Sequence, residues 1–150
     1  MTISFIKNFF LLAILLFCLL QATQVHAQRQ KYKIVIANGL PSDSPPLTAH
    51  CRSKDDDIGN HTLKVNEFFS WRFAMNFWGT TRFYCRFIWG RKTTFFDVFK
   101  KHLAFEHCGD STLYVNICYW LVKEDGFYLA NTDYPKPSKL LFMHTWDGRS

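Results

Sequence analysis

Two stretches near the middle of the chain alternate between apolar and polar residues, and this alternation constrains the fold more than any other feature. From 69 to 75 the odd positions carry Phe, Trp, Phe and Met, with polar or small residues between them. From 82 to 89 the odd positions carry Phe, Cys, Phe and Trp, whereas the even positions up to 86 carry Arg, Tyr and Arg. A period of two with one polar face is typical of half-buried strands in an antiparallel sheet. We therefore expect these aromatic residues to face the core rather than to form a sugar-stacking surface.

Further strand-like segments recur along the chain, separated by turn signals such as Asn-Gly, Gly-Asp and Asp-Gly and by the prolines at 41, 45 and 46. No segment keeps a helical period over three turns, although a short helix has room between Phe99 and Phe105. Seven or eight short, regularly spaced strands predict an all-β fold, either a sandwich or a barrel. The additional strand segments are 31–36, 47–51, 63–65, 93–99, 113–122 and 127–129, and an apolar segment at 140–146 forms the tail.

The N-terminal segment has the features of a secretory signal peptide. One positive charge, Lys7, precedes an uncharged apolar run at 9–20, and the tripeptide Val-His-Ala at 25–27 supplies a small-residue cleavage site. A membrane anchor needs about 20 apolar residues, and this run is shorter. No second apolar segment of spanning length follows, and the C-terminus carries no endoplasmic-reticulum retention signal. We therefore expect a signal peptide at 1–27, one domain at 28–150, and secretion from the cell.

The number of cysteines is consistent with a protein that folds in an oxidising compartment. Cys18 lies in the signal segment, and four others remain: Cys51, Cys85, Cys108 and Cys118. An even number in a small extracellular domain predicts two disulfides, and three pairings stay open. Each bridge stabilises such a domain by roughly 2–4 kcal/mol. Because a zinc site needs close pairs such as Cys-x-x-Cys, which are absent from the sequence, we expect neither a metal nor another cofactor.

The composition describes a folded and moderately basic domain. An aromatic content of 18% excludes a mainly disordered chain. The whole chain carries a net charge of +6, and loss of the single charge of Lys7 leaves +5. Such a surface suits acidic partners, among them wall polysaccharides, membrane lipids and acidic receptor faces. The basic residues are scattered, with adjacent pairs only at 91–92 and 100–101, so we expect no nucleic-acid site.

No constellation of catalytic residues stands out. A secreted ribonuclease needs two histidines as acid and base, and five histidines qualify by residue type alone: His50, His61, His102, His107 and His144. None lies in a ribonuclease motif, and His50 beside Cys51 suits a structural role at the edge of the core. The chain has no Gly-x-Ser-x-Gly elbow, and its extracellular cysteines are expected in bridges. We therefore expect no enzymatic activity.

The order of several short motifs resembles the plant self-incompatibility proteins, the S-proteins and S-protein homologs. The motifs cover nearly all of the segment 28–150, and the longer tail through Trp146 is the main departure. No single motif is diagnostic, but their order is specific in combination with four cysteines and a signal peptide. The matching pieces are VIANGL at 35–40, HCRSKDDDIG at 50–59, FSWRF at 69–73, GTTRFYC at 79–85, FDVF at 96–99, CYW at 118–120 and DGFY at 125–128.

The resemblance implies a β-sandwich, secretion and a ligand-like role. Together with the strand pattern and the cysteine count, it leads us to expect a small antiparallel β-sandwich of seven or eight strands stapled by two disulfides. In the founding members the stigma secretes the protein, a membrane protein of incompatible pollen perceives it, and pollen-tube growth is arrested. We therefore expect an extracellular monomer that acts as a signalling or recognition ligand for a cell-surface receptor protein. The alternative is a basic defence or cell-wall-associated protein that contacts an acidic wall or membrane surface.

The acidic run Asp55, Asp56 and Asp57 raises the question of calcium. A helix-loop-helix calcium site spaces its ligands alternately and closes with a Glu, whereas these side chains are contiguous and cannot converge on one ion. The resemblance suggests instead a structural turn, in which an Asp accepts hydrogen bonds from nearby backbone N–H groups. We expect this turn motif to comprise the three aspartates and Gly59.

Two further surface features are expected. Asn60-His61-Thr62 is a sequon for N-glycosylation beside the charged turn, so Asn60 is a candidate glycan site. Because rigid sandwiches present variable loops for binding, we expect recognition by the segments 41–46, 60–62, 90–94 and 106–111. The aromatic residues expected to be exposed are Trp78, Tyr84 and Tyr128.

Overall fold

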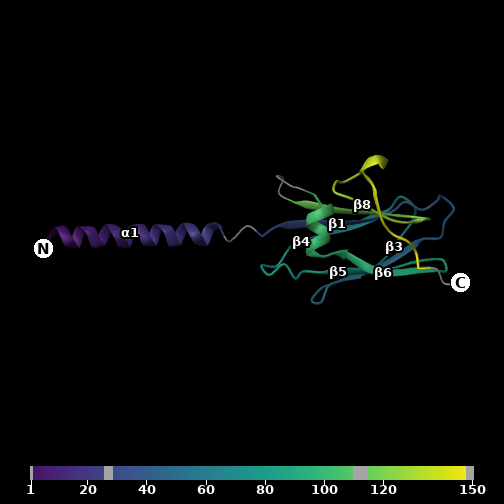
Figure 1. Cartoon of the computed structure of the whole chain (residues 1–150). Coiled ribbons are helices and arrows are strands. Elements are labelled where there is room, and N and C mark those ends of the chain that lie inside the picture. The colour runs from purple at the N-terminus through teal and green to yellow at the C-terminus, as the bar shows by residue number, and fades with distance from the viewer. Residues whose placement is uncertain (1, 26–28, 110–114, 148–150) are drawn as a thin grey trace.

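Two β-sheets packed face to face form the main body of the protein, and a long N-terminal helix projects from one end of it (Figure 1). This computed structural model describes residues 2–25, 29–109 and 115–147. Its described residues form nine strands, two α-helices and a short 3-10 helix, Pro137–Lys139. The predicted all-β sandwich is confirmed.

The first sheet has four strands in the order β3-β2-β5-β6, and every neighbouring pair is antiparallel. Strand β5 (Phe83–Trp89) has the predicted alternation, because Phe83, Cys85 and Phe87 are buried and the residues between them reach the surface. The other strands are β2 (Leu47–Arg52), β3 (Asp57–Leu63) and β6 (Lys92–Phe99).

The second sheet has five strands in the order β4-β1-β7-β8-β9. Its pairs are antiparallel except for β1 and β7, which run parallel, so the expectation of a wholly antiparallel sandwich needs this refinement. Seven or eight strands were predicted, and the ninth strand is formed by the apolar tail. The strands are β1 (Lys31–Asn38), β4 (Phe68–Ala74), β7 (Asn116–Lys123), β8 (Gly126–Ala130) and β9 (Leu141–His144).

The core lies between the two sheets and is rich in aromatic residues. Trp120 of β7 is fully buried, and its indole Nε1 donates a hydrogen bond to the carbonyl oxygen of Val98 at 3.0 Å. Phe87 contacts Phe127 across the layers, with ring centroids 4.8 Å apart. The aromatic residues at positions 69, 71 and 73 pack against this core as predicted.

The structure pairs Cys51 with Cys85 and Cys108 with Cys118, so the two predicted disulfides are present. Cys51 and Cys85 lie opposite each other on β2 and β5. The second bridge ties the end of α2 (Lys101–His107) to β7. Helix α2 occupies the space left for a short helix after Phe99, two residues later than expected.

The N-terminal helix α1 spans Thr2–Val25. The side chains of residues 3–20 are exposed, and the described core contains no residue of α1, so the sandwich does not depend on α1 for its core. The window Ile3–Leu20 is long and apolar enough to cross a membrane, which exceeds the shorter run considered above. Helix length therefore does not separate a signal peptide from an anchor, and the cleavage tripeptide extends beyond the described residues.

Candidate functional site

The outer face of the four-stranded sheet carries a grid of polar and aromatic side chains. Strand register aligns them in rows across neighbouring strands, because directly paired residues point to the same side of a sheet. One row runs across Asp57, Arg52, Tyr84 and Asp97, and the next runs across Asn60, His50, Arg86 and Phe95. The grid therefore gathers residues from all four strands, and its extremes, His50 and Asp97, are 47 residues apart in sequence.

Tyr84 lies at the centre of the aromatic part of the grid. The guanidinium carbon of Arg52 lies 5.3 Å from the centre of its ring. Phe95 approaches the same ring edge-on, with the ring centroids 5.3 Å apart. Phe95 itself is 57% exposed, so an apolar ring and a cation are presented together to solvent. Arginine over an aromatic ring contributes roughly 0.5–1 kcal/mol at an exposed site.

Charge on this face is only partly neutralised. Asp97 accepts a 2.7 Å bond from Nε of Arg82, and Asp57 lies 2.9 Å from Nε2 of His50. Arg52 and Arg86 take part in none of the ion pairs formed within the described residues. The face therefore keeps two exposed guanidinium groups that can each form a bidentate contact with a carboxylate or phosphate.

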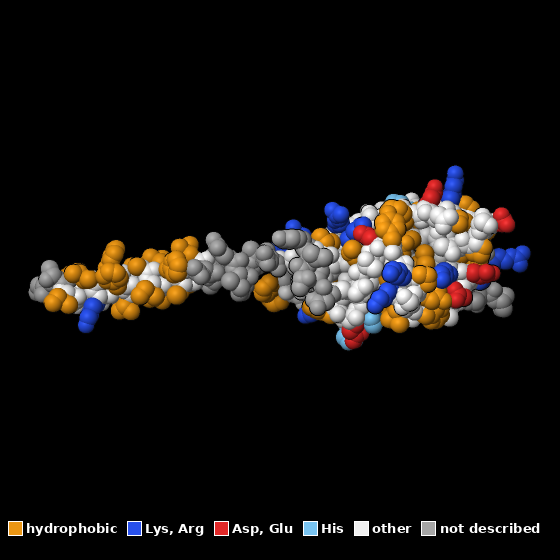
Figure 2. Space-filling model, turned by 90° about the horizontal axis from the view of Figure 1, so that it is seen from above, with side chains coloured by type: hydrophobic (Ala, Val, Ile, Leu, Met, Phe, Trp, Pro, Cys, Tyr) orange, Lys and Arg blue, Asp and Glu red, His pale blue; other side chains and the backbone are white. Residues whose placement is uncertain are grey.

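A shallow groove of about 490 Å³ runs over this part of the sheet. Basic and aromatic side chains form most of its walls, and Asp147 closes one end, where its backbone N–H bonds to the carbonyl oxygen of Thr93 at 3.2 Å. Figure 2 shows another side of the sandwich, seen from above, where Lys, Arg, Asp and Glu side chains are intermixed. The groove lining is His50, Arg52, Tyr84, Arg86, Thr93, Thr94, Phe95 and Asp147.

The acidic run forms a hydrogen-bonded turn at one edge of this face. The Ser53 hydroxyl accepts the backbone N–H groups of Asp55 and Asp56 at 3.2 and 2.9 Å. Asp57 Oδ1 accepts the backbone N–H of Gly59 at 2.9 Å and lies 2.9 Å from His50 Nε2. The bond from Gly59, and then that from His50, holds the pKa of the Asp57 carboxyl below its usual value. In the described residues no three His, Cys, Asp or Glu side chains gather as ligands of a metal ion.

The predicted recognition segments lie only partly in loops. Residues 60–62 belong to the edge strand β3 rather than to a loop. Residues 90–94 form the β5–β6 turn and the start of β6, and residues 41–46 connect β1 to β2. The segment 106–111 covers the end of α2, and its last two residues lie outside the described part of the chain. Trp78 is exposed, whereas Tyr84 and Tyr128 are half-buried.

The histidines are dispersed in different surroundings. His50 faces Asp57, whereas His61 of β3 stacks on Phe69, with ring centroids 3.8 Å apart. His144 of β9 stacks on Phe96 at 4.2 Å, and burial followed by the nearby charge of Lys100 lowers its pKa. His102 and His107 lie on α2, each within 3.5 Å of a carboxylate oxygen of Glu106.

Sequence analysis alone did not identify the outer face as a site. The residues at positions 82, 84 and 86 could be assigned to the solvent-facing side of the alternating stretch, and this assignment indicates part of the site. The contributions of Arg52 and Phe95 come from other strands, and only the register of β2, β5 and β6 brings them beside Tyr84.

Comparisons with known proteins agree on one family. The model of the family described as plant self-incompatibility protein S1 matches residues 33–146. S-protein homolog 29 of Arabidopsis thaliana is 31% identical over 120 residues, which cover 80% of this chain and 83% of the relative. S-protein homolog 2 of the same plant is 38% identical over 80 residues, which cover 53% of this chain and 48% of that relative.

A solved structure has the same fold. It is described as that of SPH (self-incompatibility protein homologue) proteins, a widespread family of small, highly stable, secreted proteins from plants. The superposition has a TM-score of 0.57 and covers 80% of this chain and 97% of the other. At 22% sequence identity, this likeness concerns the fold alone.

Proposed function

Because the chain belongs to the plant self-incompatibility protein S1 family, we propose that it is a secreted recognition protein that binds an acidic surface of a cell-surface protein. The observation that carries this proposal is the outer face of the four-stranded sheet. There Arg52 and Arg86 take part in none of the ion pairs of the described residues. Arg52 lies over the ring of Tyr84, and Arg86 pairs in register with the exposed Phe95. Arginine and aromatic residues side by side are typical of the residues that dominate binding energy at protein interfaces.

The proposal includes the maturation of the chain. We take residues 1–27 as a signal peptide that is removed, so that the domain 28–150 is released from the cell. The exposed apolar helix α1 supports this, because it adds nothing to the described core. Binding without catalysis is the proposed mode of action, since His61 and His144 stack on core-facing aromatic rings.

We also propose that Asn60 carries an N-linked glycan. Asn60 is exposed on the edge strand β3, and it pairs in register with His50 on the outer face. A glycan there would shield the unpaired edge of the sheet from other strands, which is a common way to prevent edge-to-edge association. It would also border the groove on one side and leave the Phe95 side accessible.

The test is binding of fluorescently labelled protein, produced by secretion, to plant protoplasts. N-terminal sequencing of the released protein checks for a start near Gln28. The double variant Arg52→Gln/Arg86→Gln is expected to bind protoplasts about thirtyfold more weakly, because each of the two guanidinium groups that contact an acidic partner contributes on the order of 1 kcal/mol. Pretreatment of the protoplasts with protease is expected to remove the part of the binding that the double variant weakens.

A matched control carries the same loss of charge away from the grid. In Lys136→Gln/Lys139→Gln both substituted residues are exposed, one just before the 3-10 helix and one at its end. Equal weakening by the two double variants would show that net charge alone governs binding. Binding to polygalacturonate that is lost at moderate salt, with none to protoplasts, would favour the alternative of a wall-associated protein.

A further inference from the structure

The loop between β4 and β5 carries two exposed aromatic side chains at its tip. Phe77 and Trp78 are 67% and 80% exposed, and their ring centroids lie 5.3 Å apart. Trp78 is the most exposed large hydrophobic side chain among the described residues. We call this pair the aromatic tip. Two adjacent large aromatic rings in water are unfavourable by themselves, and such surfaces mark sites of interaction.

Hydrogen bonds hold the loop in one conformation. The side chain of Asn76 donates to the Thr80 hydroxyl at 2.7 Å and accepts the backbone N–H of Thr80 at 2.8 Å. The backbone N–H of Asn76 also donates to the Thr81 hydroxyl at 2.9 Å. Gly79 adopts a φ of +67°, and the aliphatic chain of Lys101 packs against it. The tip is therefore kept pointing outward by the loop and by α2.

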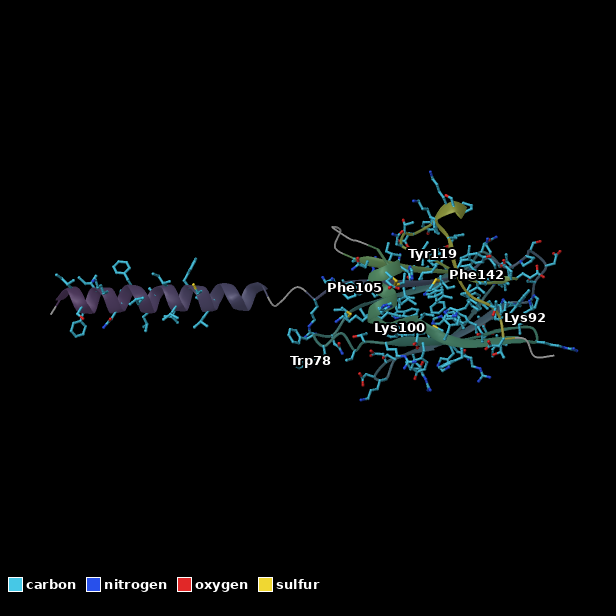
Figure 3. The ribbon with its side chains drawn as sticks, in the orientation of Figure 1. Trp78, Lys92, Lys100, Phe105, Tyr119 and Phe142 are labelled. Atoms are coloured by element: carbon cyan, nitrogen blue, oxygen red, sulfur yellow. A yellow bond between two sulfur atoms is a disulfide. The ribbon has the colours of Figure 1, made fainter. Side chains whose placement is uncertain are left out.

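The aromatic tip lies at the end of the sandwich where α1 joins it. Lys31 at the start of β1 pairs with Ala74 at the end of β4, and the backbone N–H of Met75 donates to the carbonyl oxygen of Gln30 at 3.0 Å. Figure 3 shows Trp78 pointing away from the sandwich at this end, on the side of α1. Until the proposed signal peptide is removed, α1, which is long and apolar enough to cross a membrane, places this end of the sandwich next to the bilayer.

Cationic side chains accompany the tip. Lys101 lies along Gly79, directly beside Trp78, and it is exposed. Arg29 and Lys31 are exposed at the same end. Aromatic rings flanked by Lys and Arg are typical of segments at the boundary between lipid headgroups and acyl chains, where the rings insert and the cations contact anionic lipids.

We propose that this end of the sandwich docks on the surface of a lipid bilayer, with the aromatic tip inserted into the interfacial region. A protruding pair of rings suits a deformable bilayer surface, which closes around it and needs no matching pocket. Arg29, Lys31 and Lys101 hold anionic headgroups around the inserted rings. This surface is separate from the grid on the four-stranded sheet, so the lipid contact leaves the grid free for a protein partner.

The experiment uses residues 28–150, whose described core contains no residue of α1, with sedimentable phosphatidylcholine vesicles that contain either no or about 30% phosphatidylserine. The domain is expected to sediment with the anionic vesicles and more weakly with the neutral ones. Phe77→Ser/Trp78→Ser is expected to lower the partition coefficient about a hundredfold, because each of the two inserted rings contributes roughly a factor of ten. The tryptophan emission of the unmodified protein should shift to shorter wavelength with anionic vesicles, and that of Trp78→Phe should not.

Phe95→Ser is the matched control, because Phe95 is also exposed but lies on the outer face of the four-stranded sheet. It is expected to leave vesicle binding unchanged and to weaken protoplast binding, so the two proposals can fail separately. The lipid proposal is wrong if no vesicles are bound, or if the double tip variant binds as well as the unmodified protein. It is also wrong if the tip variant weakens only the protease-sensitive binding to protoplasts, since the tip would then contact a protein.

Discussion

At the scale of single residues, His144 is a titratable side chain that packs against an aromatic ring at the edge of the core. Its ring stacks on Phe96 with centroids 4.2 Å apart. Burial, followed by the nearby charge of Lys100, lowers its pKa, while Asp147 and Asp97 oppose the shift. Arg82 lies in the same surface depression. The folded protein therefore favours the neutral form of His144.

This preference predicts a loss of stability in acid. When the pH falls through the ordinary histidine pKa near 6.5, the unfolded chain takes up a proton before the folded one does. The free energy of unfolding should therefore decrease from pH 7.5 to pH 5, and the decrease should end below the lowered pKa of the folded state. Guanidinium denaturation at the two pH values measures this difference, which His144→Gln is expected to reduce.

The control is His102→Gln, because the side chain of His102 is 80% exposed on α2. This variant should keep the full difference between the two pH values. If His144→Gln and His102→Gln both retain it, protonation of His144 does not cause the loss of stability between pH 7.5 and pH 5.

At the scale of elements, the pairing of β8 with β9 depends on one glycine. Gly126 begins β8, and a side chain there would collide with the carbonyl oxygen of His144 and with the ring of Phe142. One of the colliding atoms is the backbone carbonyl oxygen of His144, so rotation of a side chain cannot remove the collision. The tail forms β9 only because the chain has no Cβ at this position.

Gly126→Ala is therefore expected to destabilise the protein by about 2 kcal/mol, as overpacking of a close contact does. Guanidinium denaturation measures the change in the free energy of unfolding. The control is Gly90→Ala, at a turn with a φ of +55° and no atom within 4 Å of the added methyl group. It should cost only about 1 kcal/mol, from backbone conformation. Equal costs would mean that the close approach of β9 does not contribute.

The elements also show what the sequence could and could not predict. Strands β4 and β5 could be predicted because one face of each strand packs on the core and the other faces solvent. Apolar and polar residues therefore alternate along their sequences. Strand β3 was expected only at 63–65, because an exposed edge strand that contains Gly59 and Asn60 has no such alternation. The tail at 140–146 was noted as apolar, but its strand depends on the distant contact with Gly126.

At the scale of the whole molecule, pairing between strands that are distant in sequence determines features that the local residue pattern does not predict. The spacing of the cysteines left three pairings, and the register of β2 against β5 brings Cys51 and Cys85 together. The parallel pairing of β1 with β7 likewise has no local signal. The same holds for the candidate site, because its polar residues on β5 were visible whereas Arg52 and Phe95 reach it through pairing.

The two disulfides should contribute unequally to stability. The Cys51–Cys85 bridge joins residues 34 positions apart, and the Cys108–Cys118 bridge joins residues 10 apart. A longer closed loop restricts the unfolded chain more, so paired replacement by Ala should cost about 4 kcal/mol for the first bridge and about 3 kcal/mol for the second. Chemical denaturation of the two double variants measures these values. A larger loss from the shorter loop would show that native packing near α2, rather than chain entropy, dominates.

The central position of β1 has a consequence for the order of folding. β1 lies between β4 and β7, and its partner β7 follows it by about 80 residues. If residues 1–27 act as the proposed signal peptide, β1 is the first strand to cross the membrane, and it has to wait, incompletely paired, until most of the chain has followed. Contacts of such high sequence separation make folding slow, so the chain would stay unfolded, and able to pass through a translocation channel, until its export is nearly complete.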